Sequence, residues 1–519
     1  MKRLTPTRRR CRTAAVCAAA AVLAGCVSLP PFEGRTVSAA FTDTQETRLG
    51  RSVATSAQIH PGKSGIHALI DAHDAFAARV WLARAAERSL DIQYYIWRND
   101  ITGALLFEEL RRAADRGVRV RLLLDDTTTA GLDATLAALD SHPNIEIRLF
   151  NPFAARGARA LSLLTDFSRL NRRMHNKSFT ADNQATIIGG RNVGDEYFGA
   201  AHGVLFVDLD VLAVGNVVAD VSRDFDRYWA SEASYPAALL VAGADVPSSS
   251  LISEAAAGVM SDPAAQEYGR ALRDSAFAQS LTDGTLQLEW ASTRLISDDP
   301  AKALDKAAPD ALMLDQVTKV ISEANEHFEL VSPYFVPGAK GTAALVALVP
   351  RGIEIRVLTN ALEATDVVPV HAGYSKRRKA LLAGGIALYE LRRRPNLPAG
   401  RSRSVSTGSS GSSLHSKTFA VDGKRVFVGS FNFDLRSARL NTEMGLIVES
   451  EGLAGRIRDA FEQRIPQAAY EVRLSDKGDL YWIERRGGEL VRRDIEPGTS
   501  VWERNVVRFL SLFDIDWLL

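Results

Sequence analysis

The sequence predicts an α/β protein built from two similar α/β domains that pack about a pseudo-twofold axis and share one active site. Three observations support this prediction: a repeated motif, a repeated order of strands and helices around it, and a nearly constant spacing between the copies. The chain has 519 residues, of which 46% are hydrophobic and 24% charged. This composition is typical of a globular protein that is long enough for two or three domains.

The repeated motif is His-x-Lys-x4-Asp, followed by two small residues and then an asparagine. It occurs as MHNKSFTADNQATIIGGRN at 174–192 and as LHSKTFAVDGKRVFVGSFN at 414–432. The chain has nine histidines, and each charged residue type makes up roughly 6% of an average sequence. A lysine at +2 and an aspartate at +7 of some histidine should then occur about 0.03 times per chain by chance. The two copies therefore indicate an internal repeat.

The elements before each motif repeat as well. LDIQYYIW at 90–97 and FELVSPYFV at 328–336 are apolar, aromatic and β-branched runs that indicate buried strands. Each precedes a helix-like stretch ending at Gly117 or Gly352, and then a second strand, VRVRLLLDD or IEIRVLTN. The offsets of the two copies, 352 − 117 = 235 and 415 − 175 = 240, keep the halves in register. Strands that alternate with helices predict βαβ units around largely parallel sheets.

These patterns divide the chain into six segments. We expect a signal peptide at 1–25, a polar tether at 26–60, the first domain at 61–235, a connecting segment at 236–282, the second domain at 283–470 and a C-terminal extension at 471–519. The apolar end of the extension favours a helix that docks on the protein, although a helix on a membrane surface stays an alternative. The arginine-rich segment 392–413 fits either a loop that attracts anionic lipid or a merely solvated loop.

The N-terminus has the features of a lipoprotein signal. Residues 1–25 carry six Lys and Arg and no acid, and their apolar run of about ten residues is too short to span a bilayer. The sequence LAGC resembles a bacterial lipobox, which implies cleavage before Cys26 and lipidation of its sulfur. We therefore expect an envelope protein that is lipid-anchored and faces the periplasm. Val27 is not the aspartate that favours inner-membrane retention, so the outer membrane is favoured.

The charge and cysteine content narrow the classes of function. Without the leader, the chain has 63 − 6 = 57 Lys and Arg against 62 Asp and Glu, a net charge of −5. Such a chain has no general basic surface for nucleic acid, so no nucleic-acid partner is expected. Cys26 is the only cysteine after cleavage, which excludes a disulfide or a cysteine-based metal site within one mature chain.

The two motifs, if brought together, would place two imidazoles and two ammonium groups in one cleft. Such a cleft suits a phosphate ester, because lysines stabilise a multiply charged oxyanion and histidine can act as nucleophile or acid near neutral pH. One histidine would attack phosphorus to form a phosphohistidine while the other protonates the leaving oxygen. Lys177, Lys417, Ser430 and the asparagines would stabilise the phosphate oxygens.

The paired motifs resemble those of the phospholipase D superfamily, over the chain from about residue 60 to the C-terminus. The resemblance implies the twin-domain fold, no metal or other cofactor, and a phosphohistidine intermediate. It implies that His175 is the nucleophile and His415 the general acid. The residues that match phosphate-binding positions are Lys177, Lys417, Asn192, Ser430 and Asn432. Asp208 and Glu443 match acids that orient the two histidines, and Gly190 replaces a serine of the family pattern.

The sequence allows two interpretations of the role of the motif aspartates. The resemblance places Asp182 and Asp422 in the catalytic set with the histidines and lysines. Both also lie in hairpin-turn sequences, ADNQ and VDGK, and this turn chemistry favours a structural role. Two further histidines, His202 and His371, are expected at the surface or behind the site, although His371 could line the cleft.

Several segments, such as GGRNVGDEYF and LEATDVVPVHAGY, are similar to bacterial cardiolipin synthases of the C type. This likeness implies phosphatidyl transfer between membrane phospholipids, with phosphatidylethanolamine or phosphatidylglycerol as donor and phosphatidylglycerol as acceptor. The alternatives are phospholipid hydrolysis by the same mechanism and, less favoured, cleavage of nucleic acid. A non-catalytic envelope protein is disfavoured because both motifs are complete. Whether an accessory protein takes part is left open.

Overall fold

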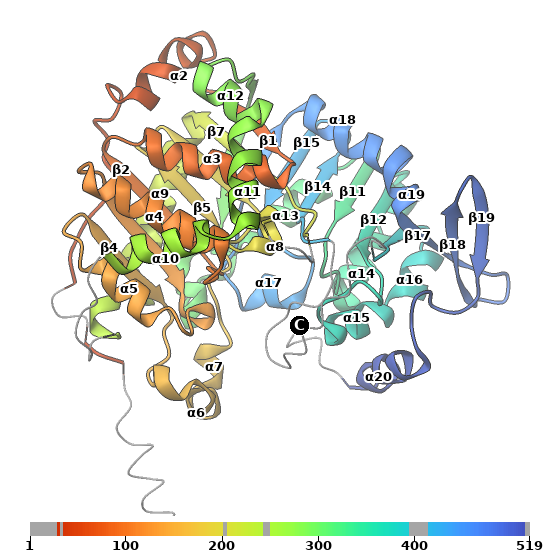
Figure 1. Cartoon of the computed structure of the whole chain (residues 1–519). Coiled ribbons are helices and arrows are strands. Elements are labelled where there is room, and N and C mark those ends of the chain that lie inside the picture. The colour runs from red at the N-terminus through yellow and green to blue at the C-terminus, as the bar shows by residue number, and fades with distance from the viewer. Residues whose placement is uncertain (1–28, 32–34, 201–204, 242–249, 394–413, 514–519) are drawn as a thin grey trace, which may run out of the picture.

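The computed structural model describes residues 29–31, 35–200, 205–241, 250–393 and 414–513. Three sets of predicted features lie outside these residues: the leader with Cys26, His202, and the arginine-rich segment beyond Arg393. Figure 1 shows two halves side by side, each with a twisted sheet and helices packed against it.

The first sheet has nine strands in the order β8-β4-β3-β2-β5-β6-β7-β1-β9. Its strands are β1 (Ser64–Leu69), β2 (Ser89–Tyr94), β3 (Arg119–Asp125), β4 (Ile145–Phe150), β5 (Ser178–Ala181), β6 (Ala185–Gly189), β7 (Asp210–Gly215), β8 (Ser234–Pro236) and β9 (Glu289–Ala291). The helices that precede α13 are α2 (Arg48–Ile59), α3 (Ala72–Ala85), α4 (Ile101–Asp115), α5 (Asp133–Asp140), α6 (Arg159–Thr165), α7 (Phe167–Leu170), α8 (Asp195–Phe198), α9 (Asn216–Ala230), α10 (Ser250–Met260), α11 (Pro263–Asp274) and α12 (Ala276–Asp283).

The second sheet has ten strands in the order β10-β16-β15-β14-β11-β12-β13-β17-β18-β19. Its strands are β10 (Thr293–Ser297), β11 (His327–Val331), β12 (Glu354–Asn360), β13 (Ala387–Leu391), β14 (Thr418–Val421), β15 (Arg425–Gly429), β16 (Met444–Glu449), β17 (Ala469–Leu474), β18 (Leu480–Arg486) and β19 (Glu489–Arg493). The helices are α13 (Met313–Ser322), α14 (Gly338–Val346), α15 (Val368–Ser375), α16 (Arg378–Ala383), α17 (Leu435–Arg439), α18 (Glu451–Asp459), α19 (Ile465–Ala468) and α20 (Val501–Ser511).

The two sheets share one topology, which confirms the predicted repeat. The order β4-β3-β2-β5-β6-β7-β1 in the first sheet recurs as β13-β12-β11-β14-β15-β16-β10 in the second. The expectation of largely parallel sheets is wrong, because both sheets are mixed. Only β2, β3 and β4, and likewise β11, β12 and β13, run parallel, whereas the strands that carry and follow each motif pair antiparallel.

A short hairpin follows each motif histidine and explains the antiparallel part. β5 and β6 are joined by a turn in which Asp182 and Asn183 both have φ near 51°, and β14 and β15 by one in which Asp422 and Gly423 have φ of 53° and 62°. Paired positive φ values are the geometry of the hairpin turn that matches the twist of antiparallel strands. The turn sequences ADNQ and VDGK therefore form the hairpins that they indicate.

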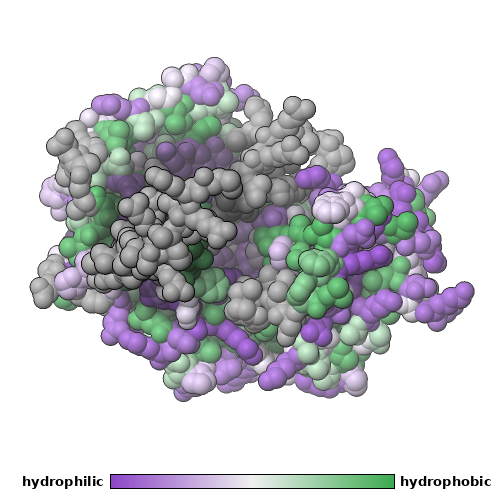
Figure 2. Space-filling view, turned by 90° about the horizontal axis from the view of Figure 1, so that it is seen from below, coloured by the Kyte–Doolittle hydropathy of each residue, from purple (hydrophilic) through white to green (hydrophobic). Residues whose placement is uncertain are grey.

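The two halves meet through a shared apolar core. Ile188 and Val211 of the first sheet belong to one buried cluster with Val428 and Leu446 of the second. Because each sheet contributes one face to this cluster, the ends of β5 and β14 that carry the two histidine motifs are held in a fixed relation to each other. Figure 2 shows the molecule from below, where apolar residues lie beside hydrophilic ones on both halves.

The segments between and beyond the two domains are also ordered against them. Helices α10, α11 and α12, within or next to the predicted connection, pack on α3 and α4, and the chain passes from the first sheet to the second at Ser292. Residues 35–59, expected in the tether, run along the first domain, where Arg35 donates to the carbonyl of Ser231 at 2.7 Å, and end in α2. Of the predicted extension, β18 and β19 widen the second sheet and α20 packs on α15. In the described part of the chain, no helix has both the length and the apolar content needed to cross a bilayer.

Candidate active site

The two motif histidines lie where the halves meet, at equivalent ends of their sheets. His175 precedes β5, which is antiparallel to β2, so it lies at the carboxyl end of β2, and His415 lies likewise at the carboxyl end of β11. Each motif is bridged to the opposite half by its backbone. The amide of His175 donates to the carbonyl of Thr442 at 2.9 Å, and that of His415 to the carbonyl of Val207 at 2.9 Å. The two motifs thus form one site across the domain interface.

Each histidine is held by a carboxylate from the other half. His175 Nδ1 lies 2.8 Å from Glu443 Oε2, and His415 Nδ1 lies 2.6 Å from Asp208 Oδ2. In the described residues, neither Nε2 has a hydrogen-bond partner of its own. A carboxylate on Nδ1 fixes the proton there and leaves the lone pair of Nε2 available for bonding to another atom. The arrangement therefore presents two oriented imidazole nitrogens.

Glu443 makes several hydrogen bonds besides its contact with His175. Its buried carboxylate accepts hydrogen bonds from Ser430 and from Ser437 Oγ, the latter at 2.8 Å, and its backbone amide donates to Asp298 Oδ2 at 2.9 Å. Burial alone would raise the pKa of Glu443, but His175, Lys177 and Ser430 together lower it. Burial likewise opposes ionisation of Asp208, yet His415 and Lys417 lower its pKa to about 2. Both acids are therefore carboxylates at neutral pH.

The protein groups around the two histidines keep both of them neutral. Burial, reinforced by Lys177 and opposed by Glu443, lowers the pKa of His175 to about 4. Burial and Lys417, opposed by Asp208, lower the pKa of His415 to about 3. A neutral imidazole is the form required of a nucleophile. A general acid needs the protonated form, and an anionic phosphate entering between the histidines would raise both pKa values by favouring the imidazolium.

The two lysines supply the positive charge of the site. Lys177 Nζ donates to the carbonyl of His175 at 2.5 Å, and Lys417 makes the equivalent bond to the carbonyl of His415. Burial lowers the pKa of Lys177 to about 7 and that of Lys417 to about 8. Each ammonium group has donors beyond its one carbonyl bond, and a bound phosphate would hold both lysines in the charged form.

The predicted phosphate-binding residues other than the lysines differ in their hydrogen-bond partners. Asn192 is tied into the protein, since its Oδ1 accepts from the amide of Ile96 at 3.1 Å and its Nδ2 donates to Tyr197 at 3.0 Å. Ser430 donates to Glu443, so it stabilises the acid that holds His175. The Oδ1 of Asn432 is buried without a hydrogen-bond partner in the described residues. Because this oxygen is an acceptor, a hydroxyl or another donor of a bound ligand can satisfy it, whereas an ionised phosphate oxygen cannot.

Gly190, which stands where the family pattern has a serine, is explained by the shape of the site. A Cβ at this position would lie 2.2 Å from Asp208 Oδ1, far inside contact distance. In the second half, the equivalent residue is Ser430, which fits and donates to Glu443. The carboxylate of Asp208 therefore occupies the space that a serine side chain at position 190 would need, whereas in the second half Ser430 fits beside Glu443.

The structure corrects the catalytic assignment of Asp182 and Asp422. Both lie at the opposite ends of β5 and β14 from the histidines. Asp182 is fully buried and accepts from the backbone amides of Glu87, Arg88 and Ser89 at 2.7–3.2 Å. Asp422 accepts in the same way from the amides at 325–327, at 2.8–3.1 Å. These aspartates join each hairpin to the start of the neighbouring central strand, the structural role that their turn sequences favour.

Sequence reasoning missed the aromatic walls of the site. The ring of Tyr95 meets that of His175 edge-on, with centroids 5.0 Å apart, and Lys177 Nζ lies 5.6 Å from the Tyr95 centroid. Tyr197 and Phe206 each lie 5.1 Å from the ring of His415. The available signal was the placement of Tyr95 near the end of the strand predicted at 90–97, at the edge where the motifs meet. By contrast, His371 does not bond to either motif histidine, and instead pairs with Glu496 at 2.9 Å.

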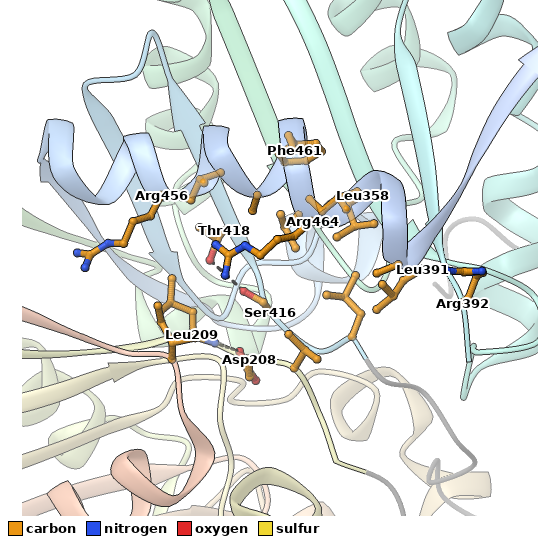
Figure 3. Close-up of a pocket in the computed structure, with 18 of the residues that line it drawn as sticks. Asp208, Leu209, Leu358, Leu391, Arg392, Ser416, Thr418, Arg456, Phe461 and Arg464 are labelled. Carbon is orange, nitrogen blue, oxygen red and sulfur yellow. Dashed lines mark hydrogen bonds between the residues drawn. The ribbon is translucent and has the colours of Figure 1, made fainter. Parts of the chain in front are cut away.

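A cavity of about 750 Å³ lies beside the histidine site (Figure 3). Its lining includes Ser416, Thr418, Asp208 and Leu209, with Arg456 and Arg464 among its charged residues, but none of the four motif His and Lys side chains. The cavity is therefore lined by the neighbours of His415, Ser416 and Asp208, and not by the reacting side chains themselves. In the part of the chain that is described, no group of three or more His, Cys, Asp or Glu side chains is placed to hold a metal ion.

Comparison with known proteins finds chains of similar sequence and similar fold. The family profile described as "Cardiolipin synthase, PLD-like domain" matches residues 82–229 and 317–465, one match in each half. The chain is 49% identical to cardiolipin synthase C of Escherichia coli over 91% of its own length and all of that protein. It is 32% identical to an uncharacterized protein of Helicobacter pylori, over 89% of this chain and 91% of that one. The fold is similar to that of a phosphatidylserine synthase from Haemophilus influenzae, with a TM-score of 0.56, 14% identity, and coverage of 90% of this chain and 100% of that chain.

Proposed function

The chain belongs to the family of cardiolipin synthases with phospholipase D-like domains, and on that basis we propose that it is a phosphatidyltransferase. Its substrates would be membrane phospholipids, with phosphatidylglycerol as acceptor and phosphatidylethanolamine or phosphatidylglycerol as donor, and its product cardiolipin. The observation that carries the proposal is the pair of crossed contacts, His175 to Glu443 and His415 to Asp208, in one site.

The first half-reaction forms a covalent intermediate. His175 Nε2 attacks the phosphorus of the donor lipid, and the bond from phosphorus to the head-group oxygen breaks. The leaving oxygen takes a proton from His415 Nε2, whose imidazolium is stabilised by Asp208. Lys177 and Lys417 stabilise the negative charge that develops on the phosphoryl oxygens. The result is a phosphatidyl group on His175 and a free head-group alcohol.

The second half-reaction transfers the phosphatidyl group. His415, now neutral, takes the proton from a hydroxyl of phosphatidylglycerol, whose oxygen attacks phosphorus and releases His175. Glu443 stabilises the positive charge that His175 carries in the intermediate. Water in place of the lipid hydroxyl would give phosphatidic acid, so phospholipid hydrolysis is the second candidate function. The partly apolar walls of the site, Tyr95, Tyr197 and Phe206, favour a lipid acceptor over water.

We further propose that lipidated Cys26 holds the protein at a membrane of the bacterial envelope, on the periplasmic side and favouring the outer membrane. This proposal rests on the order of the basic, apolar and LAGC segments in the leader. A Cys26→Ser variant should leave the membrane pellet after a salt wash and retain activity on detergent-dispersed lipid. Retention of the variant in the washed pellet to the same extent as the unaltered chain would contradict the anchor.

The transferase assay uses the purified full chain and vesicles that contain labelled phosphatidylglycerol with or without phosphatidylethanolamine. Mass spectrometry of the lipids should find cardiolipin as the main product, and His175→Asn should abolish it. His60→Gln is the matched control, because His60 stacks on Trp290 at 4.8 Å and contacts no motif residue. Phosphatidic acid as the sole product would favour hydrolysis, and cleavage of plasmid DNA without any lipid product would contradict the proposal.

A further inference from the structure

Helix α20 leaves an apolar face uncovered. Trp502 is 75% exposed, Phe509 60% and Leu512 81%. Trp502, Val506 and Phe509 follow one another at intervals of four and three residues, so they lie along one stripe of the helix, and Phe513 follows just beyond its end. Large exposed side chains of this kind are uncommon on a surface that contacts only water.

This face is exposed although the helix is firmly held. Val507, on the opposite side of α20, is buried in a cluster with Leu362 and Ala372. The segment before the helix is fixed by Glu496, which lies 2.9 Å from His371 Nε2 and 2.8 Å from the guanidinium of Arg378. A capping box of Ser500 and Glu503 closes the N-terminus of the helix. The helix thus docks on the protein, as expected, and presents a second apolar face outward.

The first domain has a comparable apolar element. Leu164 in α6 is 85% exposed, and Leu161, Leu163 and Phe167 of α6 and α7 are also exposed. Helix α7 ends at Leu170, five residues before His175, so this element leads directly into the first motif. Two apolar elements, one from each half, therefore rise from the surface.

Both elements lie at the edge of the molecule that carries the histidines. Helices α6 and α7 follow the carboxyl end of β4, which is parallel to β2 and β3, and α20 packs on α15, which follows the carboxyl end of β12. The histidines lie at the carboxyl ends of β2 and β11. In Figure 1 the two elements form the lower side of the molecule, one under each half, and Figure 2 shows this side with apolar residues on both halves.

The arginines near the two elements differ in how they are paired. Each of the five arginines in residues 156–173 lies within ion-pair distance of an aspartate, whereas Arg508 of α20 is exposed. The exposed apolar side chains of α20, with an exposed arginine among them, suit a surface with an apolar interior and anionic head groups. An aromatic residue such as Trp502 is favoured at the boundary between the two.

We infer that α6–α7 and α20 together form a membrane-docking face that seats the histidine site on an anionic phospholipid bilayer. The inference rests on the proposed function and specifies how the site meets its substrate. A lipid then passes from the bilayer into the site between two inserted elements. A bilayer fits better than a second protein, because the two apolar elements are separate and lie on either side of the place where the lipid must enter.

The first experiment measures insertion without any turnover. The full chain is mixed with vesicles of phosphatidylglycerol and phosphatidylcholine whose acyl chains are brominated, and tryptophan fluorescence is compared between the protein and its Trp502→Phe variant. The difference isolates Trp502, which we expect to be quenched by the brominated lipid. A lipid anchor does not produce this signal by itself, because it does not bring Trp502 into the acyl region. Absence of Trp502 quenching on vesicles that the protein demonstrably binds would overturn the inference.

The second experiment measures interfacial activity. Trp502→Ser combined with Phe509→Ser, and separately Leu164→Ser combined with Phe167→Ser, should each raise the apparent KM for vesicle lipid about tenfold or more. Their turnover of a short-chain, detergent-dispersed phosphatidylglycerol should stay within about twofold, because these residues do not contact the histidines. Ile59→Ser is the matched control, since Ile59 is 68% exposed on α2, at the upper side of Figure 1.

The outcomes separate this inference from the proposed function. Quenching of Trp502 without any phosphatidyl transfer would leave the docking face standing and contradict the transferase. Transfer with an unchanged KM in both double variants would contradict the docking face alone. If the variants instead change the mass of the particle in light scattering and Trp502 is not quenched, the face is a contact between copies of the chain and the inference is overturned.

Discussion

Replacement of Glu443 by glutamine is the perturbation that distinguishes the roles of the two histidines most clearly. The change keeps the size of the side chain and removes the negative charge 2.8 Å from His175 Nδ1. Since a hydrogen bond to a charged group contributes roughly 1.5–3 kcal/mol, its loss should slow attack on phosphorus by about 10-fold to 150-fold. The loss can be larger, because a glutamine amide that donates to Nδ1 favours the tautomer whose proton is on Nε2, the attacking atom.

The assay is a single-turnover measurement with labelled phosphatidylglycerol, quenched in base because a phosphohistidine is labile in acid. Glu443→Gln should slow formation of the protein-bound label by the stated factor. Glu449→Gln is the matched control, because Glu449 is an exposed acid at the far end of β16, the strand that begins directly after Glu443. Asp208→Asn should instead slow departure of the head group, and a donor with an activated leaving group should restore its rate but not that of Glu443→Gln. Formation of the label at the normal rate in Glu443→Gln would refute the assignment of Glu443 as the residue that orients His175.

Four other outcomes follow from the same geometry. kcat/KM should decline above about pH 3, where free His415 loses its proton, and decline more steeply as the pH rises through about 7–8, where Lys177 and Lys417 also lose theirs; Lys177→Arg should move the steeper fall upward, and a profile flat to pH 10 in the unaltered chain would contradict this. Asp182→Ala should lower the free energy of unfolding by about 2–3 kcal/mol in urea, since it leaves buried amides unpaired, and should barely change kcat. Gly190→Ser should displace the Asp208 carboxylate and lower kcat at least about tenfold, with folding checked by circular dichroism. EDTA should leave kcat unchanged, because lysines stabilise the phosphate, and a loss that added metal restores would argue against the mechanism.

The repeat could be predicted because it depends on local sequence patterns. The two motifs, their hairpin turns and the apolar strands before them depend on neighbouring residues, so the similarity of the two halves was predictable from the spacing, whereas the strand order within each sheet was not. The mixed character of the sheets was missed, although the hairpin turns at Asp182 and Asp422 imply antiparallel pairing of the strands they join. The same turn sequences also indicated the structural role of these aspartates, rather than the catalytic role that the motif implies.

The rest of the site depends on contacts between distant residues. Nothing local shows that Asp208 lies against His415, 207 residues away, or that Glu443 lies against His175; only the family resemblance pointed to these acids. Ser437 and Phe206 could not be recognised, because a serine or phenylalanine acquires a role here only through its position in the fold. The absence of a serine at 190 was visible in the sequence, but its cause, the carboxylate of Asp208, was not.

The central claim is that His175 carries the phosphatidyl group between donor and acceptor. The most direct test is to incubate the full chain briefly with phosphatidylglycerol whose phosphate is labelled, quench in base, digest, and locate the label by mass spectrometry. We expect the label on the peptide that contains His175, none in His175→Asn, and accumulation in His415→Asn when the donor has an activated leaving group. Label on His415, or transfer that continues in His175→Asn, would contradict the claim.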